Sequence, residues 1–150
     1  MVLPQSGPLP IVPSHVYSAG LPVSPVIAIV DDDESSREAL GLLIKSLGFS
    51  GEIFASAAEF LEWERFPETA CLIADINMPG MSGMELHRHL VKTGRTIPTA
   101  LITGYPDDSV RDRALADGVI AYLCKPCSES ALLACIHSAL RARKSDQDLT

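Results

Sequence analysis

Five polar side chains in this sequence each stand at the end of a short apolar run. They are Asp31, Asp32, Asp75, Thr103 and Lys125. If the runs are parallel strands, their carboxyl ends meet at one edge of a sheet, where ligands and chemistry collect. A carboxylate placed there can bind a cation or attack an electrophile such as phosphorus. Asp75 follows residues 71–74, a run of small or apolar side chains that is typical of a buried strand. It is therefore the main candidate for this chemistry.

Carboxylates that are crowded at one edge need a partner of opposite charge. Two of them repel by roughly 4 kcal/mol at about 4 Å when the effective dielectric constant is about 20. A divalent cation relieves this repulsion. Oxygen ligands select a hard ion, and Mg²⁺, which keeps several waters and accepts a few carboxylates plus a phosphate, fits better than zinc. Lys125 and the Thr103 hydroxyl would then contact the oxygens of a phosphoryl group.

The apolar pattern from Val26 onward alternates between strand-like and helix-like segments. The first helix shows apolar residues at i, i+3, i+4 and i+7 and is closed by Gly48. Parallel strands need crossovers of helical length, so five strands and five helices predict a parallel sheet covered on both faces. The expected strands are 26–30, 52–54, 70–75, 99–103 and 120–124, and the later helices are 56–66, 83–92, 107–117 and a last one that starts near Ser128.

Length and charge restrict the class of protein. The chain has 150 residues, 47% of them hydrophobic, which suits one compact domain. Its net charge of −7, from 12 basic and 19 acidic residues, argues against nucleic acid or an anionic membrane surface as a partner. No apolar run approaches the roughly 20 residues that span a bilayer, and no signal peptide is recognisable. We therefore expect a cytoplasmic protein with a protein or cation partner.

The amino-terminal residues 1–25 differ from the rest of the chain. They carry no charged side chain and contain six of the 11 prolines. Proline removes a backbone donor and disfavours helix at the preceding residue, so we expect an extended or disordered extension. Residues 144–150 are expected to form a polar tail.

Four cysteines are present, and Cys124 and Cys127 form a C-x-x-C pair. A zinc site would need two more ligands at similar spacing, and a thioredoxin-like pair would stand after an early strand rather than the last one. With no export signal, structural disulfides are not expected. We interpret the cysteines as ordinary buried or partly buried thiols, and the sequence leaves a redox role of the pair open.

Four motifs in order resemble the receiver domain of bacterial response regulators, the chemotaxis-regulator-like family, with spacing nearest the nitrogen-fixation regulator branch. They are residues 29–33 (IVDDD), 74–83 (ADINMPGMSG), 101–104 (LITG) and 122–126 (YLCKP). The resemblance covers residues 26–143. It implies a flavodoxin-like, doubly wound α/β fold with a five-stranded parallel sheet in the order 2-1-3-4-5. It also implies a two-component signalling protein rather than a conventional enzyme.

The resemblance assigns a role to each matched position. Asp75 would accept a phosphoryl group from a histidine kinase or phosphotransfer protein. Mg²⁺ would be held by Asp32 directly, by Asp31 through water, by Asp75 and by the backbone carbonyl of Asn77. Lys125 would pair with the phosphoryl oxygens, Thr103 would move toward them, and Tyr122 would change rotamer with that movement. The result would be a population shift between two surface shapes that a downstream protein target can distinguish.

The sequence departs from the family pattern at Cys127, where an aromatic residue is common after Lys-Pro. Tyr105, two residues beyond Thr103, is bulky at a position that in this family affects water access to the phosphoryl group. Asn77 lies at another position that tunes dephosphorylation. We therefore expect the phosphoryl group to be lost slowly.

Two other interpretations stay open at this point. The order of Asp31, Asp33, Thr103 and Lys125 also resembles haloacid-dehalogenase-type Mg²⁺-dependent phosphatases, with Asp31 as nucleophile. That family needs a further acidic pair after the lysine, and it leaves Asp75 without a role. The third interpretation is a receiver-like module that binds partners without being phosphorylated.

The predicted helices end without an effector domain, so we expect a stand-alone receiver. A homodimer through helical faces is compatible with the resemblance.

Overall fold

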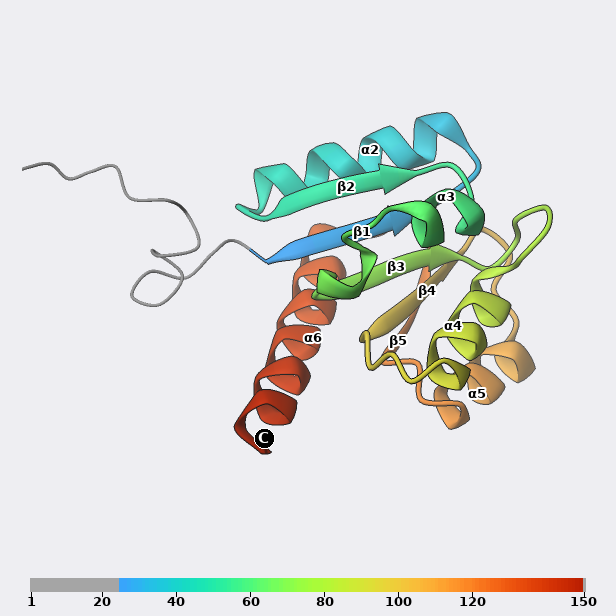
Figure 1. The fold of residues 1–150 in the computed structure, drawn as a ribbon. Coiled ribbons are helices and arrows are strands. Elements are labelled where there is room, and N and C mark those ends of the chain that lie inside the picture. The colour runs from blue at the N-terminus through green and yellow to red at the C-terminus, as the bar shows by residue number, and fades with distance from the viewer. Residues whose placement is uncertain (1–24, 150) are drawn as a thin grey trace, which may run out of the picture.

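A five-stranded parallel sheet lies at the centre of this computed structural model, which describes residues 25–149 and side chains as far as residue 143 (Figure 1). The strand order is β2-β1-β3-β4-β5, and every neighbouring pair is parallel. The expected strand number, direction and order are therefore confirmed. The strands are β1 (Val26–Val30), β2 (Ser50–Phe54), β3 (Cys71–Asp75), β4 (Thr99–Thr103) and β5 (Ala121–Cys124).

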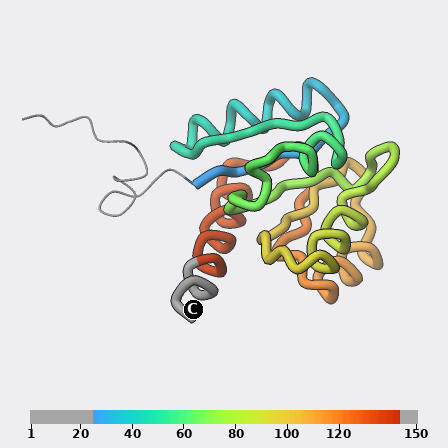
Figure 2. Tube along the Cα trace, in the orientation of Figure 1, coloured from blue at the N-terminus to red at the C-terminus, as the bar shows by residue number. Residues whose placement is uncertain are grey.

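Helices cover both faces of the sheet, as the crossover argument predicts (Figures 1 and 2). On one face lie α2 (Glu34–Ser46) and α6 (Glu129–Leu149), and their buried residues form one apolar cluster with the sheet. On the other face lie α3 (Ala57–Glu62), α4 (Gly83–Lys92) and α5 (Asp108–Ala116), which form a second cluster. The sheet is thus the middle layer of three.

Burial follows the position of each strand in the sheet. All residues of the inner strands β3 and β4 are buried, whereas the edge strands β2 and β5 are largely exposed or half-buried. Strands covered on both faces appear in sequence as continuous apolar runs, so the inner strands are recognisable from the sequence.

The observed bounds of several elements differ from the sequence expectations. β2 begins at Ser50, two residues earlier than expected, because Ser50 pairs with Val26 at the start of β1. α3 ends at Glu62 because Trp63 adopts an extended backbone conformation. The Trp63 ring packs against Phe54, with 5.2 Å between the ring centroids. A 3₁₀ turn, Phe66–Glu68, follows.

Helix α6 is also longer than expected. It runs to Leu149 and so continues through most of the residues that we expected to form a polar tail. The expected extension over residues 1–25 lies outside the described residues except for Pro25, so it stays a prediction.

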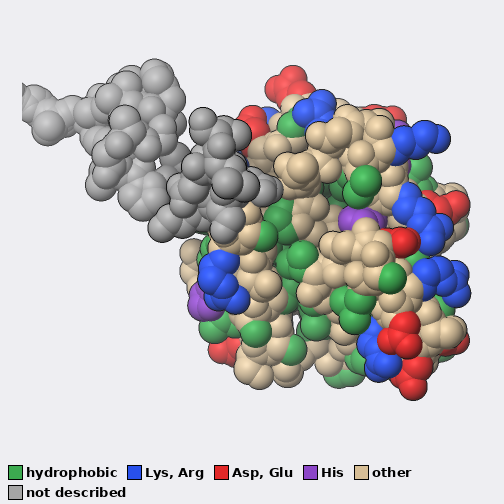
Figure 3. Space-filling view, turned by 90° about the horizontal axis from the view of Figure 1, so that it is seen from below, with side chains coloured by type: hydrophobic (Ala, Val, Ile, Leu, Met, Phe, Trp, Pro, Cys, Tyr) green, Lys and Arg blue, Asp and Glu red, His purple; other side chains and the backbone are tan. Residues whose placement is uncertain are grey.

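Charges of both signs occupy the surface. Seen from below, Lys and Arg side chains lie beside Asp and Glu side chains (Figure 3). Arg88 pairs with Asp117 at 3.0 Å and Arg111 with Asp108 at 3.2 Å. Among the helices of the described residues, none combines the length and apolar character that crossing a membrane requires.

Candidate functional site

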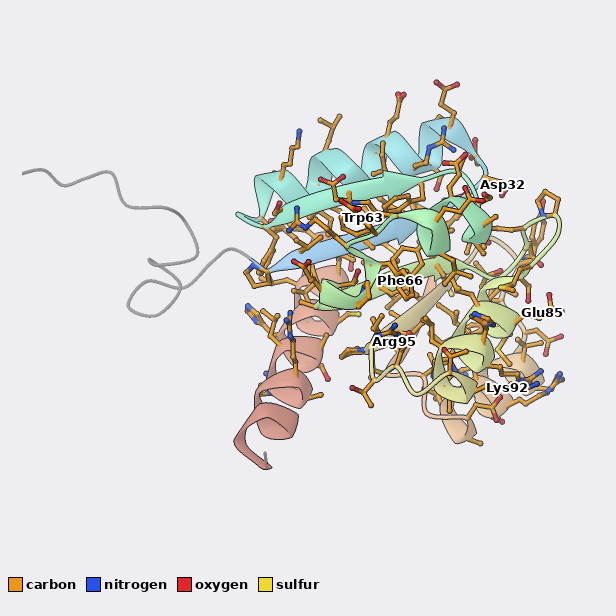
Figure 4. All side chains as sticks on the ribbon, in the orientation of Figure 1. Asp32, Trp63, Phe66, Glu85, Lys92 and Arg95 are labelled. Carbon is orange, nitrogen blue, oxygen red and sulfur yellow. The ribbon has the colours of Figure 1, made fainter. Side chains whose placement is uncertain are left out.

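The polar residues that follow the strands meet at one edge of the sheet. Asp31 and Asp32 come directly after β1, Asp75 is the last residue of β3, Thr103 is the last residue of β4, and Lys125 directly follows β5. The parallel register keeps these ends level. Asp32 is labelled in Figure 4 beyond the carboxyl end of β1. The expected convergence of these side chains is therefore present.

Three carboxylates form the acidic part of the site. One oxygen from each of Asp31, Asp32 and Asp75 lies within 4.8 Å of the others. Asp31 is fully buried and Asp75 is 4% exposed, whereas Asp32 is exposed to solvent. The acidic cluster thus combines two buried carboxylates with one that is exposed to solvent.

Lys125 bridges the two buried carboxylates. Its Nζ lies 2.7 Å from Oδ2 of Asp75 and 2.9 Å from Oδ2 of Asp31. Burial alone would lower the pKa of the ammonium group, but hydrogen bonds and charge attraction from Asp75 and Asp31 outweigh it and raise the pKa of Lys125. The lysine therefore stays charged beside both carboxylates.

The two buried carboxylates have opposite pKa shifts. Burial raises the pKa of Asp75, and Lys125 and the Asn77 amide offset this effect only in part. Burial also acts to raise the pKa of Asp31, but hydrogen bonds from Ser36 and Asp33 and the charge of Lys125 outweigh it, so the pKa of Asp31 lies below its ordinary value. Asp75 is thus the less stabilised anion of the pair.

Contacts from the start of α2 hold Asp31 in place. The Asp33 amide donates to Oδ1 of Asp31 at 3.0 Å, and the Ser36 hydroxyl donates to Oδ2 at 2.7 Å. The Arg37 guanidinium donates to the backbone carbonyl of Asp31 at 2.9 Å. The roles of Ser36 and Arg37 are not evident from the sequence, because a serine or an arginine in the first turns of a helix is ordinary and indicates no particular partner.

Thr103 and Asn77 are linked across the gap between β4 and the loop after β3. The Thr103 hydroxyl oxygen accepts a hydrogen bond from the Asn77 side-chain amide at 3.1 Å and one from the Tyr105 backbone amide at 2.9 Å. The Asn77 backbone amide donates to Oδ1 of Asp75 at 2.8 Å. Thr103 is therefore connected to Asp75 through Asn77, and its hydroxyl is buried at the site.

The two tyrosines named from the sequence lie at different depths. Tyr122 is half-buried on β5, and its hydroxyl oxygen accepts a hydrogen bond from the Asp107 amide at 2.9 Å, at the start of α5. Tyr105 is 81% exposed. Tyr122 thus ties β5 to α5, whereas the Tyr105 side chain stands in solvent next to Thr103.

Gly83 allows α4 to approach the site closely. A Cβ atom at this position would lie 2.6 Å from the backbone oxygen of Asp75 and 3.0 Å from Leu101. The helix begins here, with Ser82 and Glu85 forming a complete capping box. The lack of a side chain at Gly83 therefore lets the start of α4 pack directly on the end of β3.

The four thiols are free in the structure. Cys71 and Cys135 are buried, Cys127 is half-buried and Cys124 is exposed. The interpretation as buried or partly buried thiols therefore holds for three of them. Burial raises the pKa of Cys127 to about 11, which keeps this thiol protonated near neutral pH and makes it a weak nucleophile.

The donor set fits Mg²⁺. Three carboxylate oxygens lie close together, two of them backed by hydrogen bonds, and all are hard oxygen ligands. Asp32 is exposed to water, which suits an ion that keeps part of its hydration shell.

Comparisons with known proteins show the family of the chain. The family model for the response regulator receiver domain matches residues 27–137. The response regulator protein TodT of Pseudomonas putida is 40% identical over 116 residues, which are 77% of this chain and 51% of TodT. The transcriptional regulatory protein FixJ of Azorhizobium caulinodans is 32% identical over 127 residues, 85% of this chain and 60% of FixJ. The chain thus spans roughly half the length of the TodT proteins that it matches.

Solved structures give the same result. The response regulator StyR has a TM-score of 0.76 and 41% identity, covering 85% of this chain and 64% of that one. The FixJ-N structure has a TM-score of 0.71 and 30% identity, covering 79% and 95%. With the family model matching most of the chain, this protein belongs to the response regulator receiver domain family of two-component systems.

Proposed function

We propose that Asp75 accepts a phosphoryl group from a histidine kinase or a phosphotransfer protein. The observation that carries this proposal is the position of Lys125, whose Nζ lies within 2.9 Å of both Asp75 and Asp31. Such an ammonium group neutralises two buried carboxylates before transfer and is placed to pair with phosphoryl oxygens afterwards.

Each residue of the site then has a defined task. A carboxylate oxygen of Asp75 forms the bond to phosphorus while the bond from phosphorus to the donor's histidine nitrogen breaks. Asp32, Asp75 and the backbone carbonyl of Asn77 would hold Mg²⁺ directly and Asp31 would hold it through water, and the ion would neutralise charge on the transferred group. Lys125 and the Thr103 hydroxyl contact the phosphoryl oxygens. Transfer then depends on positioning and charge neutralisation.

The consequence of phosphorylation is a change of surface shape. For Thr103 to contact the phosphoryl group, its hydroxyl must leave the Asn77 side chain and the Tyr105 amide, which it contacts at 3.1 and 2.9 Å. Tyr122, whose hydroxyl oxygen accepts a hydrogen bond from the Asp107 amide just before α5, changes rotamer with this movement. The surface of α5, β5 and α6 is then presented to a downstream protein partner in the cytoplasm, with a homodimer as one form of output.

Two alternatives remain to be tested against this function. In a phosphatase of the haloacid-dehalogenase type, Asp31 would be the nucleophile. The chain's family membership favours a receiver over such a phosphatase. A receiver that binds partners without phosphorylation would keep the fold and leave Asp75 unmodified.

Incubation of the full chain with acetyl phosphate and Mg²⁺ separates these functions. Intact-mass measurement should find the gain of one phosphoryl group, and Asp75→Asn should abolish it. Asp112→Asn, which removes an exposed carboxylate from α5, is the control and should keep the gain. Catalytic turnover by the wild-type chain, lost together with the modification in Asp31→Asn, would support the phosphatase. No gain in the wild-type chain, with either acetyl phosphate or a histidine-phosphorylated donor, would support the binding module.

A further inference from the structure

The Ser36 hydroxyl contacts the buried acidic pair without being part of the expected motif. Its Oγ donates to Oδ2 of Asp31 at 2.7 Å. This Oδ2 atom also lies 2.9 Å from Nζ of Lys125. Asp31 is fully buried, whereas Ser36 is half-buried in the first turn of α2. Two donors from different elements therefore share one carboxylate oxygen.

This hydroxyl is directed at the acidic site rather than at its own helix. The N-cap residue of α2, Asp33, makes no side-chain capping hydrogen bond. A serine at the N-cap position would accept a hydrogen bond from a backbone amide of the first turn, but Ser36 is the third residue of the helix. Ser36 instead reaches back five positions to Asp31, and Arg37 beside it donates to the Asp31 carbonyl at 2.9 Å. The first turn of α2 is thus fastened to Asp31.

We infer that Ser36 is a positioning residue that holds the Asp31 carboxylate in the orientation used for Mg²⁺. This inference rests on the proposed function. The Asp33 amide fixes Oδ1 and the Ser36 hydroxyl fixes Oδ2, so that both oxygens are held even when Lys125 turns toward a phosphoryl group on Asp75. Without the hydroxyl, Oδ2 would depend on Lys125 alone.

The hydrogen bond contributes to the metal site by pre-organisation. Partners outside the ligand set orient the ligands, and their removal typically lowers metal affinity by about 10-fold to 100-fold. Asp31, which would hold Mg²⁺ through water, is fully buried. Its carboxylate has two other donors, the Asp33 amide and Lys125, and Lys125 also contacts Asp75. We therefore expect the loss to lie near the lower end of that range, because the Asp33 amide stays in place.

The test measures the Mg²⁺ affinity of the full chain by titration calorimetry. Ser36→Ala should weaken Mg²⁺ binding by about 10-fold, and Ser36→Thr, which keeps a hydroxyl, should restore most of the affinity. Ser35→Ala is the matched control: its hydroxyl lies on the same turn but donates to Asp33 at 3.3 Å, so Mg²⁺ affinity should not change. In Ser36→Ala, phosphorylation by acetyl phosphate should need a higher Mg²⁺ concentration to reach half of its maximal rate. The rate at saturating Mg²⁺ should equal that of the wild-type chain.

Three results would overturn the inference. Ser36→Ala could bind Mg²⁺ as tightly as the wild-type chain, Ser35→Ala could lose as much affinity as Ser36→Ala, or Ser36→Thr could fail to restore affinity. The first two results leave the proposed function intact, since the wild-type chain still binds Mg²⁺ and is still modified on Asp75. A wild-type chain that binds no Mg²⁺ would contradict the proposed metal site itself, and this inference with it.

Discussion

The Nζ atom of Lys125 lies 2.7 Å from Oδ2 of Asp75, although the two residues are 50 positions apart in the sequence. β4 separates the strands that carry them, so the long lysine side chain spans the end of an intervening strand. The same Nζ contacts Asp31 at 2.9 Å. One cation therefore compensates two buried carboxylates, and both the stability and the chemistry of the site depend on it.

Lys125→Met should destabilise the Mg²⁺-free protein. Methionine keeps most of the side-chain volume but leaves Asp31 and Asp75 without their shared cation. Breaking a buried ion pair costs about 3 to 5 kcal/mol, and we expect a value of about 3 kcal/mol or less because the Lys125 side chain is 21% exposed. Denaturant unfolding measures this change. Mg²⁺ should recover part of the loss. Lys45→Met, on the exposed side of α2, should leave stability nearly unchanged, and an equal loss in both variants would contradict the argument.

Gly83→Ala should disturb the site and the fold together. The added Cβ would lie 2.6 Å from the backbone oxygen of Asp75, so α4 or the end of β3 must shift. Overpacking of this kind costs about 1 to 3 kcal/mol, and the shift should also slow phosphorylation of Asp75. Gly104→Ala is the control, because its Cβ would meet no atom within 4 Å. Thermal unfolding and the rate of mass gain with acetyl phosphate measure the two effects. Identical behaviour of both variants would show that the close approach is unimportant.

The fold and the main site residues could be predicted because both depend on a simple pattern. Each strand is a short apolar run, and Asp75, Thr103 and Lys125 stand at the ends of such runs. Parallel strands in level register carry their last residues to the same edge. The order of the strands came from the family resemblance, since alternation alone predicts a parallel sheet but not which strands are neighbours.

The contacts that refine the site could not be predicted in this way. Ser36 reaches Asp31 only because the first turn of α2 is folded back over the end of β1, and nothing in its sequence position indicates that direction. The need for glycine at position 83 depends on how closely α4 packs on β3. The continuation of α6 to Leu149 was missed because polar residues there show no apolar face. These features depend on packing between elements.

Tyr105→Ala should accelerate loss of the phosphoryl group. The Tyr105 side chain is 81% exposed, and its amide donates to the Thr103 hydroxyl beside the site. If the ring shields an aspartyl phosphate from attacking water, its removal should raise the dephosphorylation rate several-fold while stability changes little. Decay of the phosphorylated mass measures the rate. Leu42→Ala removes another exposed apolar side chain, on α2, and should decay like the wild-type chain. An unchanged rate in Tyr105→Ala would contradict the shielding role.

His87 should make stability depend on pH near neutrality. It is 6% exposed on α4, and burial lowers its pKa below the ordinary value of 6.5, with Asp117 opposing and Arg88 adding to the shift. The unfolded chain therefore binds more protons than the native one just below that value, so stability is complete above it and is lost as the pH falls. The melting temperature should fall between about pH 7.5 and about pH 5.5, and His87→Gln should reduce this fall. His89→Gln, on the same helix, is the control and should keep it. An equal fall in the wild-type chain and His87→Gln would contradict the assignment to His87.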